Sequence, residues 1–438
     1  MANPIPNLFK VPELKEKILF TLGVLLLYRI GAHITAPGID VQALQAQFGQ
    51  MQNTLFGIYD MFVGGALRRA TVFALGIMPY ISASIMFQLL AAVFPTIEKM
   101  QKEGEEGQKK LTQWTRYATV ALSVIQGYSY GMYLNSIQGA VLHPGIGFLL
   151  TTTLVLTTGS VFVMWLGEQI TERGIGNGMS LLIFFSIIER FPGAIQRTLE
   201  ALTTGVMSPV ALIVLVAVMV GVVAGVVAMT MAARKLPVQI PRKVMGRGRI
   251  REGQKSFIPL RINSAGVMPI IFAQSIVIVP GTIAAFSQVP WLQRTSQMFQ
   301  PGSWAYYISY TILIVFFTYF YTAIIFNPVD LADNLKKQGA FIPGVKPGTR
   351  TAEYIDHVLS RVTLPGAFYL AVIALLPFAI FGALHMGQLF FFGGTSLLIV
   401  VGVGLDTVQQ MQQHLLLRHY EGFMKKGRVR FRGRQRYM

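Results

Sequence analysis

VALIVLVAVMVGVVAGVVAMTM, residues 210–231, is the stretch of sequence that decides the class of this protein. It contains no charged residue, whereas a soluble amphipathic helix would carry polar residues at a period near 3.6. A helix needs about 20 mostly apolar residues to cross the hydrocarbon core of a bilayer. Residues 210–231 therefore predict a transmembrane helix.

The composition extends this prediction to the whole chain. Its 438 residues are 53% hydrophobic and only 13% charged, which is typical of a membrane protein and excludes a water-soluble domain. The sequence contains no cysteine, so disulfides, thiolate metal sites and cysteine nucleophiles are excluded. The six histidines show no metal-binding spacing, and no phosphate-binding loop is present. We expect a protein with no cofactor, no metal and no enzymatic activity.

Further apolar segments follow the same pattern along the chain. The ten candidate spans are residues 18–34, 73–94, 117–134, 149–170, 179–195, 210–231, 265–286, 306–326, 364–381 and 389–408. The fifth carries Glu189, Arg190 and Pro192, so we expect a short or tilted helix there. Gly393 and Gly394 predict a late start for the tenth. No small-residue cleavage site follows the first, which we interpret as a span and not a signal peptide.

The charge distribution orients these spans. An even number of spans places both termini on one side, and most of the 37 Lys and Arg residues lie in loops or tails on that side. The positive-inside rule then makes both termini cytoplasmic. Residues 1–17 become a cytoplasmic amphipathic segment, and residues 409–438 become a basic cytoplasmic tail. The sequence predicts a multi-pass protein of the cytoplasmic (inner) membrane.

Two cytoplasmic loops carry more basic residues than topology requires. The loop 232–264 contains Arg242, Lys243, Arg247, Arg249 and Arg251. The loop 327–363 contains a stiff turn, PGVKPG at 343–348, with Lys346 and Arg350 at its tip. The positive-inside bias explains many single basic residues, but these clusters lie away from the spans. Guanidinium groups make bidentate contacts, so ribosomal RNA, an acidic motor protein and anionic lipid all remain possible partners.

The segment 58–71, IYDMFVGGALRRAT, is too short to cross the bilayer and too apolar for an ordinary loop. We interpret it as a re-entrant segment, and Gly64 and Gly65 would let it bend. Irregular backbone is tolerated at membrane depth only where protein buries it or water reaches it, so this interpretation implies an internal cavity. A helix lying in the membrane interface is the alternative on composition alone.

Several long motifs resemble one family of membrane proteins. They are GGAL at 64–67, FALGIMPYISASI at 73–85, WLGEQITERGIGNG at 165–178, NP at 327–328, ADNLKK at 332–337, GAF at 339–341, PG at 343–344 and GGTSLLI at 393–399. Together they resemble the SecY family, which provides the channel subunit of the bacterial general protein translocase, SecYEG. Because the motifs are distributed over nearly the whole chain, the resemblance covers both halves of the sequence.

The resemblance implies an all-α polytopic fold. Members of the family have ten transmembrane helices in two inverted five-helix halves around a central hourglass pore. Here the halves would be residues 18–195 and 210–408. Because each half has an odd number of spans, the second half is inverted in the membrane relative to the first. The function implied is a protein-conducting channel that passes unfolded secretory polypeptides across the membrane and releases hydrophobic segments laterally into it. The lateral gate would lie mainly between spans two and three and spans seven and eight.

The resemblance also assigns site residues. The pore ring would comprise Ile81, Ile85, Met179, Ile183, Ile271 and Ile399, with Met179 departing from the usual branched aliphatic residue. The plug would comprise Tyr59, Asp60, Met61, Phe62, Val63, Gly64, Gly65, Ala66, Leu67, Arg68 and Arg69. The i, i+4 spacing of two pairs in the ring places each pair on one helix face. An apolar ring gates by dewetting, which resists ions while a polypeptide slides through.

Partners follow from the same resemblance. They are the small membrane subunits SecE and SecG, the motor ATPase SecA, the ribosome with its ribosomal RNA, signal sequences with unfolded secretory chains, and membrane lipid. The basic residues of loops 232–264 and 327–363 would dock the ribosome or motor. Lys346 stands where the family usually has Arg, which keeps the charge but loses the bidentate contact.

Three other classes of protein compete with this interpretation. An ion-coupled small-solute transporter would bury ionisable residues in mid-span, whereas Arg29, Glu168, Glu189 and Asp406 lie toward span ends. An intramembrane aspartyl protease is disfavoured because Asp60 lies outside any regular span. An RNA-binding membrane anchor would need only the basic loops. It predicts that substitutions in the ring have no effect.

Overall fold

The structure is a computed structural model that describes residues 11–48, 55–205, 207–240, 243–245, 249–251, 255–286, 300, 303–383 and 394–426. The helices before the middle of the chain are α2 (Pro12–Gly31), α3 (Val41–Phe48), α4 (Leu55–Phe62), α5 (Met78–Val93), α6 (Pro95–Lys102), α7 (Glu105–Ser136), α8 (Ile146–Arg173), α9 (Gly178–Ile188) and α10 (Phe191–Thr203). Those that follow are α11 (Pro209–Met231), α12 (Met268–Phe286), α14 (Trp304–Ile325), α15 (Pro328–Lys337), α16 (Thr349–Ala383) and α17 (Gly394–Lys426).

Each of the ten predicted apolar segments contains a helix. Within the described residues, five helical stretches are long and apolar enough to cross a membrane, or six if the bent pair α5–α6 counts as one span. The count of ten spans therefore remains a prediction. As Glu189, Arg190 and Pro192 indicate, α9 ends early and α10 begins as a new helix at Phe191. The described part of the tenth segment, from Gly394 onward, is helical, and the predicted late start falls at the edge of the described residues.

The start of α9 is fixed by a side-chain cap. The Asn177 side chain accepts hydrogen bonds from the backbone N–H groups of Met179 and Ser180. Such a cap satisfies two of the N–H groups that a helix leaves without a partner at its start. It therefore fixes the position on the chain at which Met179 and, one turn later, Ile183 enter the helix.

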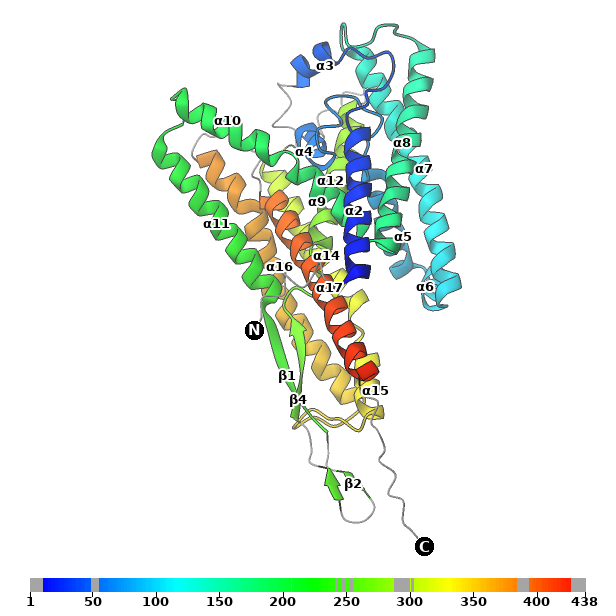
Figure 1. Cartoon of the computed structure of the whole chain (residues 1–438), viewed down its shortest axis with the longest axis vertical. Helices are drawn as coiled ribbons and strands as arrows, with labels where there is room; N and C mark the ends of the chain where they lie inside the picture. Colours follow the sequence, from blue (N-terminus) through cyan, green and yellow to red (C-terminus); the bar gives the residue numbers. More distant parts are fainter. Residues whose placement is uncertain are drawn as a thin grey trace.

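The described residues of the loop 232–264 form antiparallel β-strands, which make up a β-hairpin. Strand β1 (Ala233–Gln239) pairs with β4 (Lys255–Arg261), and the short strands β2 (Lys243–Met245) and β3 (Arg249–Arg251) pair beyond them. Figure 1 shows these strands extending from the lower end of the bundle, whereas α3, α4 and α10 lie at the upper end. The basic composition of the loop does not predict the strands.

The hairpin packs against the second basic loop. Leu236, Val238 and Leu260 are buried in one apolar cluster with Leu335 of α15 and Ile355 of α16. A backbone bridge between Gln239 and Phe341 closes the contact. The two basic loops are therefore one structural unit at the same end of the molecule.

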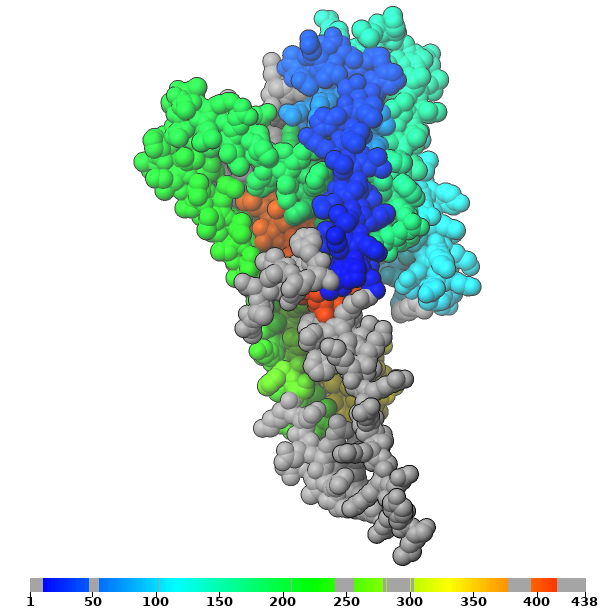
Figure 2. All heavy atoms as spheres, in the orientation of Figure 1, coloured from blue at the N-terminus to red at the C-terminus, as the bar shows by residue number. Residues whose placement is uncertain are grey.

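The β-hairpin and the loop 327–363 together are called the hairpin unit. The main apolar core is separate from this unit and lies among the helices. It includes residues of α2, α4, α5, α7, α8, α9, α11, α12, α14, α16 and α17. On the outer surface, α2 presents large apolar side chains, and Leu19, Leu22 and Leu26 are more than half exposed. Figure 2 shows α2 running along one face of the molecule. Such an exposed apolar face suits contact with lipid tails.

Candidate channel site

The six predicted ring residues come from four helices. They are Ile81 and Ile85 on α5, Met179 and Ile183 on α9, Ile271 on α12 and Ile399 on α17. The five isoleucines belong to the main core, and each is 4% exposed or less. Because α5 packs on α12, α12 on α17 and α17 on α9, these helices form a continuous arc. The predicted ring residues therefore lie on neighbouring helices of the main apolar core, and the ring itself stays a prediction.

Met179 differs from the other members of this set. Its side chain is only partly buried, and it packs against the core from the edge. The Met179 sulfur lies over Gly167 of α8, where a Cβ atom would come within 2.3 Å of it. A long, flexible methionine can occupy this position because Gly167 leaves space.

The predicted plug consists of helix α4 and the turns that follow it. Gly64 and Gly65 have φ values of +67° and +80°, the left-handed region that glycine adopts without strain. The Gly65 N–H donates to the Asp60 carbonyl at 2.8 Å, which folds the chain back directly after α4. The two glycines thus form the bend that the sequence predicted.

The plug segment is buried within the helices. In α4 every residue but Gly57 is buried, and α4 contacts α9 and α12. The Tyr59 hydroxyl donates to the Leu75 carbonyl at 3.0 Å, and the Tyr130 hydroxyl of α7 donates to the Leu67 carbonyl at 2.7 Å. This burial favours a re-entrant segment over a helix lying on the membrane surface.

Asp60 ties the plug to the junction of α9 and α10. One Asp60 carboxylate oxygen accepts from Arg190 at 2.8 Å, and the other accepts from the backbone N–H of Arg68 at 3.0 Å. The Asp60 and Arg190 side chains are only 5% and 10% exposed, so this ion pair is buried. A buried charge needs such a partner, because isolated charges are strongly disfavoured in an apolar environment.

Glu189 makes a second set of contacts to the plug. It pairs with Arg29 of α2 and lies 3.7 Å from Arg69 of the plug. Arg69 also donates to the carbonyls of Gly64 and Gly65, each at 3.1 Å. Burial and the charge of Arg68 lower the pKa of the Arg69 guanidinium, while the Asp60 carboxylate opposes that shift. Sequence reasoning placed Asp60 in the plug but did not predict its pairing with Arg190, and it assigned no function to Arg29 or Glu189.

The predicted partner-binding residues lie at the opposite end of the molecule. Lys243, Arg249 and Arg251 lie on β2 and β3, and Arg242 and Arg247 fall outside the described residues. Lys346 and Arg350 are exposed, and Arg350 makes a surface ion pair with Glu353 at 3.2 Å. Since the hairpin is bridged to Phe341, both basic clusters belong to one exposed unit.

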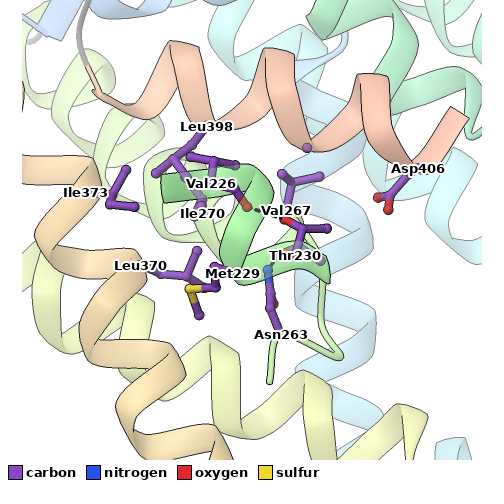
Figure 3. Close-up of a pocket in the computed structure, with 12 residues that line it drawn as sticks. Val226, Met229, Thr230, Asn263, Val267, Ile270, Leu370, Ile373, Leu398 and Asp406 are labelled. Carbon is purple, nitrogen blue, oxygen red and sulfur yellow. Dashed lines mark hydrogen bonds between the residues drawn. The ribbon is translucent and has the colours of Figure 1, made fainter. Parts of the chain in front are cut away.

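A small crevice lies among α11, α12, α16 and α17, and Figure 3 shows its lining. The walls are mainly apolar, and the polar side chains are Thr230, Asn263 and Asp406. The Asn263 amide N–H donates to the Gly266 carbonyl at 3.0 Å. The volume of about 10 Å³ is room for one water molecule at most. Among the described residues, no group of His, Asp or Glu side chains is arranged to hold a metal ion.

Taken together, the apolar helices, their shared apolar core and a buried bent segment define a polytopic membrane protein. The family model of SecY matches residues 71–408, and the chain belongs to the SecY family. Members of this family are the channel subunits of the protein translocase, and this chain is therefore a protein-conducting channel subunit.

The curated relatives match over nearly their full length. The protein translocase subunit SecY of Streptomyces griseus is 47% identical over 441 residues, covering 97% of this chain and 100% of the relative. The corresponding subunit of Aquifex aeolicus (strain VF5) is 43% identical, covering 97% and 100%. That of Escherichia coli (strain K12) is 44% identical, covering 96% of each.

Solved structures show the same fold at lower identity. A structure of a protein-conducting channel has a TM-score of 0.65 at 18% identity, covering 98% of this chain and 100% of that one. The canine Sec61 in a ribosome–channel complex has a TM-score of 0.59 at 17% identity, covering 98% and 100%. At this identity the likeness establishes the fold alone.

Proposed function

We propose that unfolded polypeptides pass through the centre of the helical bundle, between the side chains of Ile81, Ile85, Met179, Ile183, Ile271 and Ile399. The observation that supports this proposal is that these side chains, from four helices in mutual contact, all belong to the main apolar core or pack against it. An apolar constriction excludes water and ions, and it binds no particular side chain of a passing chain.

The plug closes this path in the resting state. Its buried position between α9 and α12, and its ion pairs to Arg190 and Glu189, support a seated plug. A chain entering the pore would have to displace α4 and separate these ion pairs. Energy for that step must come from a partner or from the signal sequence, since the sequence has no phosphate-binding loop.

Lateral release requires two groups of helices to separate. The gate would open between α5 and α7 on one side and α12 and α14 on the other. In the structure α12 packs on both α5 and α7. The Tyr321 hydroxyl of α14 donates to the Gln88 side-chain oxygen of α5 at 2.6 Å. This arrangement supports a closed gate with a polar contact across it.

The hairpin unit is the proposed docking surface for the ribosome and for the motor ATPase SecA. Its exposed Lys346 and Arg350, together with Lys243, Arg249 and Arg251 on the hairpin, suit phosphate or carboxylate partners. The positive-inside rule places this unit and both termini in the cytoplasm, with the plug at the external end of a channel in the cytoplasmic membrane. Exposed apolar helix faces are available to SecE, SecG and lipid.

Crosslinking of a stalled secretory chain tests this proposal. Photoreactive residues at positions 81, 179 and 271 should crosslink to the arrested chain, whereas one at exposed Leu19 of α2 should not. Crosslinks only to lipid or neighbouring helices would contradict a central path. Uptake of a small solute driven by a sodium or proton gradient would instead favour the ion-coupled transporter.

A further inference from the structure

Five arginines converge on one pocket beside the plug. The pocket has a volume of about 190 Å³ and is lined by Arg29, Gly64, Arg68, Arg69, Glu189, Arg190, Gly193, Ala194 and Arg197. The pocket is lined by residues of the turns that follow α4 and of α10, and Figure 1 shows α4 and α10 at the end of the bundle opposite the hairpin unit. Arg29 and Arg68 each have about one third of the side chain exposed, so solutes can reach the pocket.

The positive charge of the pocket exceeds its negative charge. Among the described residues, five arginines and one carboxylate, Glu189, line the pocket, and Asp60 of the plug contacts Arg68 and Arg190. Crowded cations of this kind repel one another when no further anion is present.

The location of these arginines is also unusual for a membrane protein. Basic residues are depleted from loops on the external side, because the positive-inside rule sorts them to the cytoplasm. Apart from Arg294, every Lys or Arg in the loops assigned to the external side lines this pocket. The external arginines other than Arg294 therefore all line the same pocket, and this clustering indicates a shared ligand.

The remaining wall of the pocket also suits an anion. Gly193 and Ala194 belong to the first turn of α10, and a helix N-terminus carries a partial positive charge. A Cβ atom placed on Gly193 would meet no atom within 4 Å, so space is open in front of this turn. The first turn of α10 and the five arginines therefore line the same open pocket.

We propose that this pocket binds an oxyanion of the phosphate class, supplied by a lipid headgroup or by free phosphate. A phosphate group presents oxygens in several directions and can accept from guanidinium groups on different walls. A single carboxylate presents its two oxygens in one plane and would satisfy fewer of them. The arrangement of arginines on the plug, on α2 and on α10 favours the tetrahedral anion.

The bound anion would also hold the plug in place, an extension that rests on the proposed function. Arg68 and Arg69 belong to the plug, whereas Arg29 lies on α2, Arg190 directly precedes α10 and Arg197 lies on α10. An anion that contacts both groups binds the seated plug more tightly than the displaced plug. It therefore shifts the equilibrium toward the closed channel.

Binding is tested with inorganic phosphate on the full chain in nanodiscs of zwitterionic phosphatidylcholine. We expect phosphate, but not chloride at matched ionic strength, to raise the unfolding temperature. Gly193→Asp places a carboxylate in the open space and should abolish the phosphate effect, whereas Gly193→Asn fills similar volume without charge and should retain it. Arg197→Gln, at an exposed position, should weaken the effect without affecting folding.

Plug movement is measured separately. Because the chain has no cysteine, Val63→Cys introduces a single thiol, and Val63 is only 1% exposed in the seated plug. Phosphate at ten times its Kd should slow maleimide labelling of this thiol about tenfold, since the ligand-free population falls by that factor. An unchanged labelling rate together with a raised unfolding temperature supports the site and contradicts its effect on the plug.

The source of the anion is distinguished by lipid composition. If lipid is the source, nanodiscs with phosphatidylglycerol should raise the unfolding temperature in phosphate-free buffer, and Gly193→Asp should abolish the rise. If free phosphate is the source, phosphatidylglycerol should have no effect while phosphate does. The absence of any response to both, or an identical response in Gly193→Asp, would overturn the proposal.

Discussion

At the scale of single residues, charge is the feature that distinguishes the plug from the surrounding apolar core. Asp60 is buried with two arginine contacts, and Glu189 is shared between Arg29 and Arg69. The predicted pore-ring residues, by contrast, are all apolar and belong to the main core. In the proposed channel, opening would break polar contacts at the plug, whereas the ring would widen without losing a side-chain hydrogen bond between its members.

The substitution Asp60→Asn tests the polar contacts of the plug. It leaves Arg190 buried beside a neutral amide, and removing one partner of a buried ion pair costs about 3–5 kcal/mol. Since about 1.4 kcal/mol corresponds to a factor of ten, maleimide labelling of a Val63→Cys thiol should accelerate at least about a hundredfold.

The matched control is Glu353→Gln, which breaks the ion pair with Arg350. Both side chains of that pair are more than half exposed, and such surface pairs contribute at most about 1 kcal/mol. Labelling in this variant should equal that of the parent protein. Equal labelling in Asp60→Asn would show that the buried pair does not hold the plug.

At the scale of elements, the hairpin unit is the clearest example of structure that depends on distant partners. Strand β1 alternates, with Leu236 and Val238 buried and Pro237 between them exposed. Leu236 and Val238 are buried because α15 and α16 provide an apolar surface for them. This packing fixes β1 and β4 on the helices, and β2 and β3, which carry Lys243, Arg249 and Arg251, lie beyond them along the chain.

The substitution Leu260→Ala tests the docking of the hairpin. Leu260 is fully buried, and removing such a side chain costs about 2–5 kcal/mol. We expect faster hydrogen exchange in β1 and β4 and unchanged exchange in α8 and α11. Phe257→Ala on the same strand is the control, because Phe257 is 58% exposed. Similar exchange in the two variants would mean that the hairpin is held by its own pairing alone.

At the scale of the whole molecule, the sequence predicts what is local and misses what is distant. All ten apolar segments contain helix because hydrophobic length is a property of one segment. The bend at Gly64 and Gly65 was also predictable, because glycine tolerates positive φ. The Asp60–Arg190 pair joins residues 130 positions apart, and no periodicity in the sequence signals such a contact. The strand pairing of β1 and β4 was missed for the same reason.

The proposed gate lies between α5 and α14, and the hydrogen bond that joins these helices can be removed with little change in packing. Tyr321→Phe keeps the aromatic contact with Phe272, whose ring centre lies 5.0 Å from that of Tyr321, but loses the bond to Gln88. A hydrogen bond of this kind contributes about 0.5–1.5 kcal/mol. The open population should therefore rise about twofold to tenfold.

The expected consequence is that secretory chains with weakly hydrophobic signal sequences are exported more efficiently in Tyr321→Phe. Tyr319→Phe provides the control on the same helix, because the Tyr319 hydroxyl donates to the Ser360 carbonyl of α16, a helix outside the proposed gate. If both variants export such chains equally, opening does not require the bond between Gln88 and Tyr321. If only Tyr321→Phe relaxes the requirement, separation of α5 from α14 is a step that the signal sequence drives.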